Sequence, residues 1–255
     1  MAGGTDIMVL WNAGEQNDRG ILDLSALKSW GRVRETDTHI RVGALTTMSQ
    51  LQQNDAVRRR FPLLTQASAT VGGLQIQNRA TLAGNIANAS PAGDSFPPLA
   101  VYDAQVNLVS AAGRRTLPLL EVFAGVKKTN LQPGELIAAI ELPIPKRPAR
   151  QMFRKVGTRA AQAISKTVAA GLLWMRRDGS VREMRFALGS MAPTVRRLHH
   201  VEDYVQGRKL TARTVEAACA MLEKDVSPID DLRSTREYRM QVSKNLLRSF
   251  LQPSR

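Results

Sequence analysis

The sequence predicts an α+β protein built from two domains. Three observations indicate this: short strand-like and helical segments alternate in the first part of the chain, a hairpin followed by two helices occupies the second part, and a proline-rich stretch separates them. A chain of 255 residues can bury the core of one large domain or two small ones. With 43% hydrophobic and 23% charged residues, its composition is that of a soluble globular protein.

The expected domain boundary lies near residue 147. Residues 142–148 read LPIPKRP, and proline fixes φ and lacks an amide donor, which favours an extended linker. The charge changes at the same place: residues 1–145 carry 13 basic and 12 acidic residues, whereas residues 146–255 carry 23 and 10. These two signals predict a first domain over residues 1–147 and a second over residues 148–255.

Periodicity and turn residues predict mixed elements in the first domain. Residues 46–51 read as the start of a helix with Thr47 as its cap, and residues 61–71 as a second helix closed by Gly72 and Gly73. A hairpin around Ala112-Gly113 is expected to join residues 104–109 and 116–119. Further strands are expected at residues 21–24, 39–43 and 135–142.

The second domain shows a stronger hairpin signal. Asp178-Gly179 lies between strand-like residues 169–175 and 181–188. Residues 211–224 and 234–251 then predict helices, the first with apolar side chains at Val215, Ala218 and Leu222.

The single cysteine limits the chemistry that the chain can carry. Cys219 excludes an internal disulfide and an all-cysteine iron–sulfur or zinc site on this chain alone, and its helical surroundings favour a small buried residue. The histidines, His39, His199 and His200, lie away from every motif, and the adjacent pair is expected on the surface. The sequence therefore predicts neither catalytic residues nor metal ligands.

The formal net charge of +14 suggests an acidic protein surface, a nucleic acid or an anionic membrane as partner. The basic residues are scattered between apolar stretches, without a Cys/His finger, an aromatic platform or a basic amphipathic helix. We therefore expect a solvated face or a docking face for an acidic subunit, and no binding of nucleic acid.

No apolar run approaches the roughly 20 residues of a membrane helix, so we expect no membrane insertion. The start shows no signal-peptide pattern. A cytoplasmic location is expected, or a periplasmic one if a partner carries an export signal.

Two segments, both expected to be loops, are richer in small residues than a fold alone requires. The first, AGGTD at residues 2–6, leads directly into apolar residues 7–10; the second spans residues 78–94 and has almost no long side chain. Backbone without side chains lets peptide N–H groups approach an anion closely, which suits phosphate binding. Thr5, Thr81, Asn85 and Ser90 add short donors, and Asp94 adds an acceptor. Neither segment matches the G-x-G-x-x-G or P-loop pattern, and composition alone leaves plain turns as an alternative.

Five segments follow one another along the chain: AGGTDI (2–7), QIQNRATLAGNIANASPAGDSFPP (75–98), KKTNLQPGELIAAIELPIP (127–145), FRKVGTRAAQAIS (153–165) and ALGSMAPTVRR (187–197). In this order they resemble the FAD-binding medium subunit of the molybdenum hydroxylases, the family of xanthine dehydrogenase, carbon monoxide dehydrogenase and aldehyde oxidoreductases. The resemblance implies a vanillyl-alcohol-oxidase-type (PCMH-type) FAD-binding domain followed by a smaller α+β domain of the CO-dehydrogenase-flavoprotein type.

The resemblance also implies a function. The chain would hold FAD, without a covalent link because no histidine or cysteine lies near either motif. It would take electrons from an iron–sulfur subunit, in a complex whose molybdenum-cofactor subunit oxidises the substrate, and pass them to NAD or another acceptor.

The family's cofactor contacts fall on matching positions of this sequence. The first motif and its counterpart would lie against the FAD pyrophosphate: Ala2, Gly3, Gly4, Thr5, Asp6 and Ile7, with Thr81, Leu82, Ala83, Gly84 and Asn85. Asp94 would contact the cofactor, Ile137, Phe153 and Lys155 would approach the flavin ring, and Val71 matches a further contact. Without the resemblance, Ile137 would read as a core strand residue and Lys155 as a surface charge.

The start of the chain departs from the family, whose members have a further strand and helix ahead of the first motif. Either the start of this sequence is placed too late or this is a trimmed form of the protein. In both cases we expect that the N-terminal part of the cofactor domain is missing from this sequence, at a cost in stability. Two other functions remain open: a stand-alone FAD-dependent oxidoreductase of the same fold, and a basic binding protein that has lost FAD.

Overall fold

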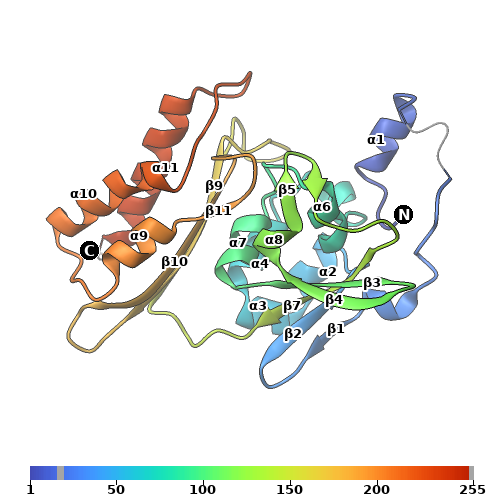
Figure 1. Ribbon diagram of the computed structural model, residues 1–255, viewed down its shortest axis with the longest axis horizontal. Coiled ribbons are helices and arrows are strands. Elements are labelled where there is room, and N and C mark those ends of the chain that lie inside the picture. The colour runs from blue at the N-terminus through green and yellow to red at the C-terminus, as the bar shows by residue number, and fades with distance from the viewer. Residues whose placement is uncertain (16–19, 253–255) are drawn as a thin grey trace. The chain divides into compact units, whose positions relative to one another are not determined.

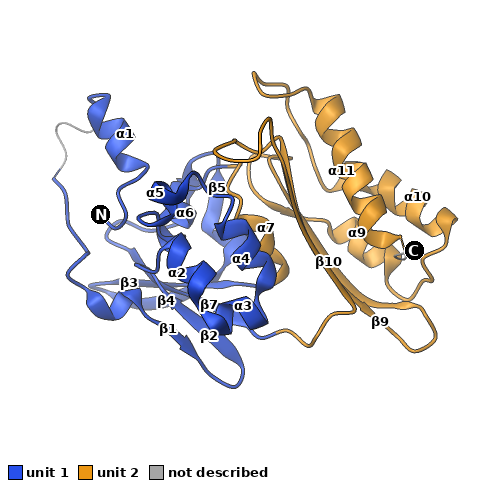
Figure 2. Ribbon diagram, turned by 180° about the vertical axis from the view of Figure 1, so that it is seen from behind, with its two compact units in different colours: residues 1–90, 103–144 blue, residues 91–102, 145–255 orange. Residues whose placement is uncertain are grey.

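The computed structural model describes residues 1–15 and 20–252, and the chain divides into two compact units (Figure 2). Unit 1 comprises residues 1–90 and 103–144, and unit 2 comprises residues 91–102 and 145–255. Each unit combines helices with an antiparallel sheet, which confirms the expected α+β class. The units are discontinuous in sequence because residues 91–102 belong to unit 2.

Unit 1 is built on a five-stranded antiparallel sheet in the order β1-β2-β7-β3-β4, with short helices on one face (Figure 1). The strands are β1 (Val33–Glu35), β2 (His39–Gly43), β3 (Gln105–Ser110), β4 (Gly113–Pro118) and β7 (Leu136–Pro143). A separate pair joins β5 (Phe123–Gly125) to β6 (Lys128–Thr129). The expected strand at residues 39–43 and the expected hairpin around Ala112-Gly113 are confirmed, and the strand expected at 135–142 is β7.

The helices of unit 1 are short, and side chains define several of their ends. They are α1 (Ile7–Asn12), η1 (Lys28–Gly31), α2 (Met48–Gln53), α3 (Asp55–Arg60), α4 (Pro62–Ser68), α5 (Leu74–Gln77), α6 (Leu82–Asn88) and α8 (Leu119–Val122). Thr47 caps α2 as expected, in a complete capping box with Gln50. The apolar side chains of α2 and α4, with those of β2, β3 and β7, form the core of this unit.

Two local expectations in unit 1 are wrong. Residues 21–24 form no strand: Leu24 N–H donates to the carbonyl of Met1, and the exposed Ile21 and Leu22 have no apolar face to bury. The helix expected over residues 61–71 ends at Ser68. There the hydroxyls of Ser68 and Thr70 bond backbone carbonyls of the last turn and compete with its continuation.

Unit 2 has three layers: α7 on one face of a four-stranded sheet, and α9, α10 and α11 on the other (Figure 2). The sheet order is β11-β10-β9-β8, and β9 is buried along almost its whole length because helices cover both faces. The elements are α7 (Phe96–Val101), β8 (Arg150–Val156), β9 (Thr167–Met175), β10 (Val181–Gly189), β11 (Arg196–Arg197), α9 (His199–Val205), α10 (Ala212–Met221), η2 (Leu222–Lys224) and α11 (Arg236–Leu251).

Most sequence expectations for unit 2 are confirmed. The strands that flank Asp178-Gly179 pair as a hairpin, and both C-terminal helices form, each with a threonine cap. Cys219 is buried in the helical core, and His199 and His200 are exposed on α9. No helix within the described residues is long and apolar enough to cross a membrane.

Candidate functional site

The first small-residue motif is a loop held against the second motif, within unit 1. A Cβ on Gly3 would lie 2.0 Å from the carbonyl oxygen of Arg79, so only glycine permits this contact. Gly4 has a φ of +78°, a left-handed conformation that also favours glycine. Asp6 and Ile7 follow at the start of α1 and are exposed. The two glycines therefore bring this loop into direct contact with the backbone that precedes Thr81.

The loop presents a run of backbone donors. The five N–H groups from Gly3 to Ile7 donate to no acceptor among the described residues. Consecutive unsatisfied peptide N–H groups on a glycine-containing turn form a concave site for an anion.

The expectation that the second motif is one continuous loop is wrong, because its middle forms the helix α6. Thr81 is the cap, with its Oγ1 accepting from the N–H of Gly84 at 3.0 Å, and Leu82, Ala83 and Ile86 bury the inner face. A capped, alanine-rich segment with apolar spacing favours a helix over a loop. Gly84 lies on the exposed side, where an added Cβ would meet only the Thr81 hydroxyl, at 2.9 Å.

The start of α6 is anchored to the cap of α2. Leu82 N–H donates to the carbonyl of Thr46 at 3.1 Å, and Met48 N–H donates to that of Ala80 at 2.9 Å. Thr47 and Thr81 also form an antiparallel bridge. Hydrogen bonds on both sides of Thr81 thus fix the position of Thr81–Asn85 within unit 1.

Val71 and Ile137 occupy different environments in unit 1. Val71 is half-buried just ahead of Gly72, whereas Ile137 is 7% exposed on β7. The strand begins beside a bidentate ion pair, in which Arg115 Nε and Nη2 donate to Glu135 at 2.6 and 2.8 Å. Arg115 and the backbone N–H of Gln132 lower the pKa of Glu135 to about 2.

Lys127 is a residue that the sequence did not single out. It lies in the turn between β5 and β6 with a φ of +56°, and its Nζ donates to Asn88 Oδ1 at 2.5 Å. The same atom lies 3.7 Å from Asp6 Oδ2. In the sequence, Lys127 is notable only as the first residue of the KKTN segment, and that position does not indicate these contacts.

In unit 2, Asp94 and Lys155 form a buried ion pair. Lys155 Nζ donates to Asp94 Oδ2 at 2.6 Å, and the side chains are 12% and 7% exposed for lysine and aspartate respectively. Phe153 lies two residues before Lys155 on β8, so both side chains project from the same face of the strand. These three predicted residues therefore share one location.

The backbone that leads to Asp94 is tied to the sheet of unit 2. Ser190 N–H donates to the carbonyl of Pro91 at 2.9 Å, and the hydroxyl of Ser165 donates to that of Ala92 at 3.3 Å. The two serine hydroxyls are themselves 3.0 Å apart. This explains why the end of the second motif belongs to unit 2 while its start belongs to unit 1.

Comparison with known proteins decides the family. The model of the FAD-binding domain in molybdopterin dehydrogenases matches residues 1–145, and that of the CO dehydrogenase flavoprotein C-terminal domain matches residues 152–254. The chain belongs to the FAD-binding subunits of the molybdenum hydroxylase family.

Individual relatives agree with this assignment. The chain is 30% identical to the xanthine dehydrogenase FAD-binding subunit of Escherichia coli O157:H7, over 98% of this chain and 86% of that protein. It is 29% identical to the glyceraldehyde dehydrogenase medium chain of Sulfolobus acidocaldarius, over 96% and 86%. A carbon monoxide dehydrogenase structure from Hydrogenophaga pseudoflava superposes with a TM-score of 0.92 at 25% identity, over 98% of this chain and 87% of that one. The expected two-domain flavoprotein fold and its FAD cofactor are thus confirmed.

The residues of unit 1 fit FAD. A dinucleotide cofactor carries a diphosphate, and the N–H groups from Gly3 to Ile7 offer it neutral donors. The one acidic side chain in this run, Asp6, is contacted by Lys127 and Asn88. The predicted residues fall into two sets: the two motifs with Val71 and Ile137 in unit 1, and Asp94, Phe153 and Lys155 in unit 2.

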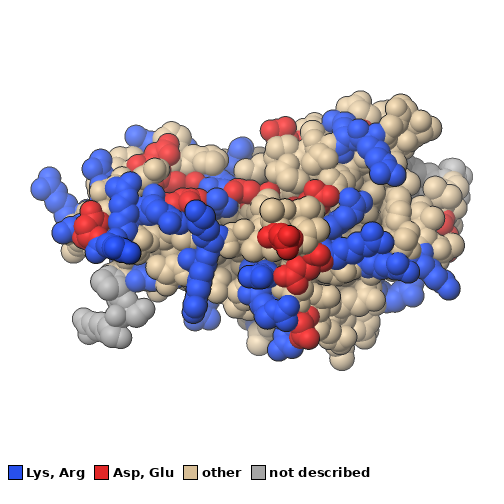
Figure 3. All heavy atoms as spheres, turned by 90° about the horizontal axis from the view of Figure 1, so that it is seen from below, with Lys and Arg blue, Asp and Glu red and all other residues tan. Residues whose placement is uncertain are grey.

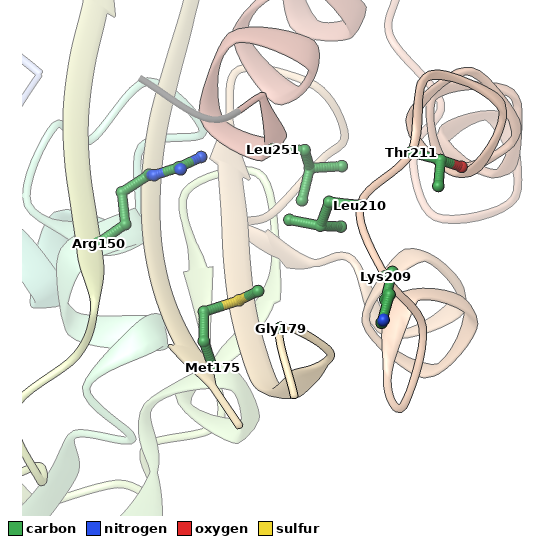
Figure 4. Close-up of a pocket in the computed structure, with 7 residues that line it drawn as sticks. All are labelled: Arg150, Met175, Gly179, Lys209, Leu210, Thr211 and Leu251. Atoms are coloured by element: carbon green, nitrogen blue, oxygen red, sulfur yellow. The ribbon is translucent and has the colours of Figure 1, made fainter. Parts of the chain in front are cut away.

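Unit 2 also contains a pocket of about 260 Å³, open to solvent, near the end of α11 (Figure 4). Arg150 and Lys209 line it together with Met175, Leu210 and Leu251. Arg150 Nη1 donates to the carbonyl of Gln252 at 2.5 Å and to that of Phe250. The lining contains no carboxylate or histidine that could act as a general acid or base, and none of the predicted FAD-binding residues.

Proposed function

We propose that this chain is the electron-transfer subunit of a hetero-oligomeric dehydrogenase and holds one FAD non-covalently. The observation that carries the proposal is the run of N–H donors from Gly3 to Ile7, packed through Gly3 against Arg79 at the edge of the second motif. An anion is the group that such a run of donors binds.

In unit 1, we assign the FAD diphosphate to residues 2–7 and 81–85. Within the second set, the hydroxyl of Thr81 already accepts from Gly84. Thr81 therefore shapes the start of α6. The N–H groups of Leu82 and Gly84 already donate to Thr46 and Thr81, so we assign the N–H of Ala83 to the anion. Val71 and Ile137 add apolar contacts to the cofactor.

In unit 2, we assign Asp94, Phe153 and Lys155 to the cofactor. A carboxylate accepts hydrogen bonds from a ring N–H or a hydroxyl, and the 2.6 Å bond from Lys155 fixes the orientation of Asp94. Phe153 offers an apolar face on the same side of β8.

When bound, FAD accepts electrons one at a time and delivers them as a pair, which suits a junction between an iron–sulfur relay and a two-electron acceptor. This chain offers no relay of its own. Its single cysteine is buried, burial raises the pKa of its thiol, and the described residues hold no group of three potential metal ligands. We therefore propose that an iron–sulfur subunit supplies the electrons and that a molybdenum-cofactor subunit oxidises the substrate. The electrons would then pass to NAD or another acceptor.

We further propose that a basic surface of unit 2 docks an acidic partner subunit in the cytoplasm. Figure 3 shows lysine and arginine side chains spread over the face in view rather than gathered in one stripe. One defined group, here called the hairpin-end cluster, consists of the exposed Arg176, Arg177, Arg208 and Lys209. Hydrogen bonds between β10 and the loop before α10 bring them together.

Two measurements test the function. Acid precipitation of the purified chain should release FAD into the supernatant; FMN, no flavin, or flavin retained on the precipitate would contradict the proposal. In the assembled enzyme, substrate should reduce the flavin, while the isolated FAD-loaded chain stays oxidised with the same substrate. Turnover of an organic substrate by the isolated chain would favour a stand-alone oxidoreductase instead.

A further inference from the structure

Lys127 occupies a backbone conformation that its residue type does not favour. It is the second residue of the two-residue turn between Gly125 of β5 and Lys128 of β6. Its φ of +56° lies in the left-handed region, where glycine and asparagine are favoured and where other residues are strained. A strained residue that persists in a short turn points to a role for its side chain.

Three contacts connect Lys127 to both FAD-binding motifs. Its backbone N–H donates to the carbonyl of Ala89, at the C-terminal end of α6, at 3.0 Å. Its Nζ donates to Asn88 Oδ1 at 2.5 Å and lies 3.7 Å from Asp6 Oδ2. Asn88 Nδ2 closes the triangle by donating to Asp6 Oδ1 at 3.2 Å. Residues from the first motif, the second motif and the β5–β6 turn therefore meet at one point.

These contacts contribute little to folding. The side chains of Lys127 and Asp6 are 53% and 55% exposed, and ion pairs at such exposure add little stability because water screens them. The helix α1, which begins at the residue after Asp6, buries none of its side chains. No side chain of α1 therefore anchors this end of the first motif in the core, and the polar triangle is its contact with α6 and the β5–β6 turn.

We propose that Lys127 is a positioning residue for the cofactor: it holds Asp6 and Asn88 together, and so sets the first motif against α6 in the geometry that binds the FAD diphosphate. This inference rests on the proposed function. The ammonium group also offsets the negative charge of the Asp6 carboxylate, which would otherwise repel the anionic diphosphate.

The experiment compares Lys127→Met, Lys127→Arg and Lys127→Asn with Lys128→Met as a matched control, because Lys128 is the adjacent, exposed lysine of β6. Hydrogen exchange of the flavin-free protein is measured over peptides covering residues 1–12, and FAD affinity is measured by quenching of flavin fluorescence. Thermal unfolding of the flavin-free forms checks folding. Lys127→Asn relieves the left-handed strain, so its melting temperature should be no lower than that of the wild type.

The expected result is faster exchange over residues 1–12 in Lys127→Met and Lys127→Asn, with FAD affinity about tenfold lower. Lys127→Arg should restore much of the affinity, and Lys128→Met should change neither readout. Unchanged exchange in Lys127→Met overturns the proposal, and unchanged FAD affinity overturns its link to the cofactor. If the wild type itself binds no FAD, the proposed function fails, while the exchange data still decide whether Lys127 orders the first motif.

Discussion

Lys155 and Asp94 form an almost wholly buried ion pair, although 61 residues separate them in the chain. Lys155 lies near the C-terminal end of β8, and Asp94 lies in the loop that precedes α7. The pair fixes the carboxylate that the family resemblance assigns to the cofactor, so the same contact supports both the packing of unit 2 and the proposed FAD site.

Breaking this pair should cost stability and FAD affinity together. Asp94→Ala or Lys155→Met breaks this buried ion pair, and removing one member of such a pair typically costs about 3–5 kcal/mol of folding stability. The double variant Asp94→Asn/Lys155→Met carries neither charge, so its stability should recover towards the wild type, while FAD affinity stays low. Urea unfolding and flavin titration measure the two quantities. Recovery of FAD affinity in the double variant would show that neither side chain contacts the cofactor.

Gly3→Ala should abolish FAD binding. Its Cβ would lie 2.0 Å from the carbonyl oxygen of Arg79, so the first motif must move away from the second. Gly31→Ala is the control, since no atom lies within 4 Å of its added Cβ. Flavin content after purification measures the effect. Stoichiometric FAD in Gly3→Ala would contradict the packing of the two motifs described above.

A bulky residue at Gly84 should also abolish FAD binding, for a different reason. The added Cβ meets only Thr81 Oγ1, at 2.9 Å, so the rest of the side chain projects to the exposed side of α6, where we place the diphosphate. Gly84→Leu should therefore fold and remain colourless, whereas Ala87→Leu, on the exposed surface of the same helix, should keep its flavin. Equal flavin content in both would place the diphosphate elsewhere.

The Arg115–Glu135 pair predicts a dependence of stability on pH. The folded-state pKa of Glu135 is about 2, below the ordinary value of about 4.3. The carboxylate therefore stabilises the folded state above pH ~4, and this contribution is lost as the pH falls towards 2. The melting temperature should fall less steeply between pH 5 and pH 2 in Glu135→Gln than in the wild type or in the exposed control Glu121→Gln. Identical slopes in all three proteins would exclude this role.

The hairpin-end cluster predicts how the complex assembles. Reversing two of its charges, in Arg176→Glu/Arg177→Glu, should slow association with the partner subunits about tenfold at low salt and weaken the dependence of that rate on ionic strength. Arg58→Glu/Arg114→Glu makes the same change of charge in unit 1 and serves as the control. If the two variants associate at the same rate, the partner docks elsewhere.

Much of the local structure could be predicted from the sequence, because short-range interactions leave short-range patterns. Thr47 caps α2, the strands on either side of Asp178-Gly179 pair, and Cys219 is buried in a helix, as their immediate neighbours indicate. The wrong prediction at residues 82–88 also came from a local pattern. The small residues there suggested a loop, yet the Thr81 cap and the buried Leu82 and Ile86 favour the helix α6.

The sequence by itself determined the family, the Asp178-Gly179 hairpin, the two C-terminal helices and the two small-residue motifs that we propose bind the cofactor, since these are encoded in residues close together along the chain. Only the tertiary structure decided that Gly3 packs against Arg79, that Lys127 reaches Asp6, and that residues 91–102 join unit 2. Such contacts depend on where distant backbone segments meet. Neither the periodicity nor the spacing of residues in a single sequence indicates which distant segments come into contact, because these contacts depend on how the whole unit packs.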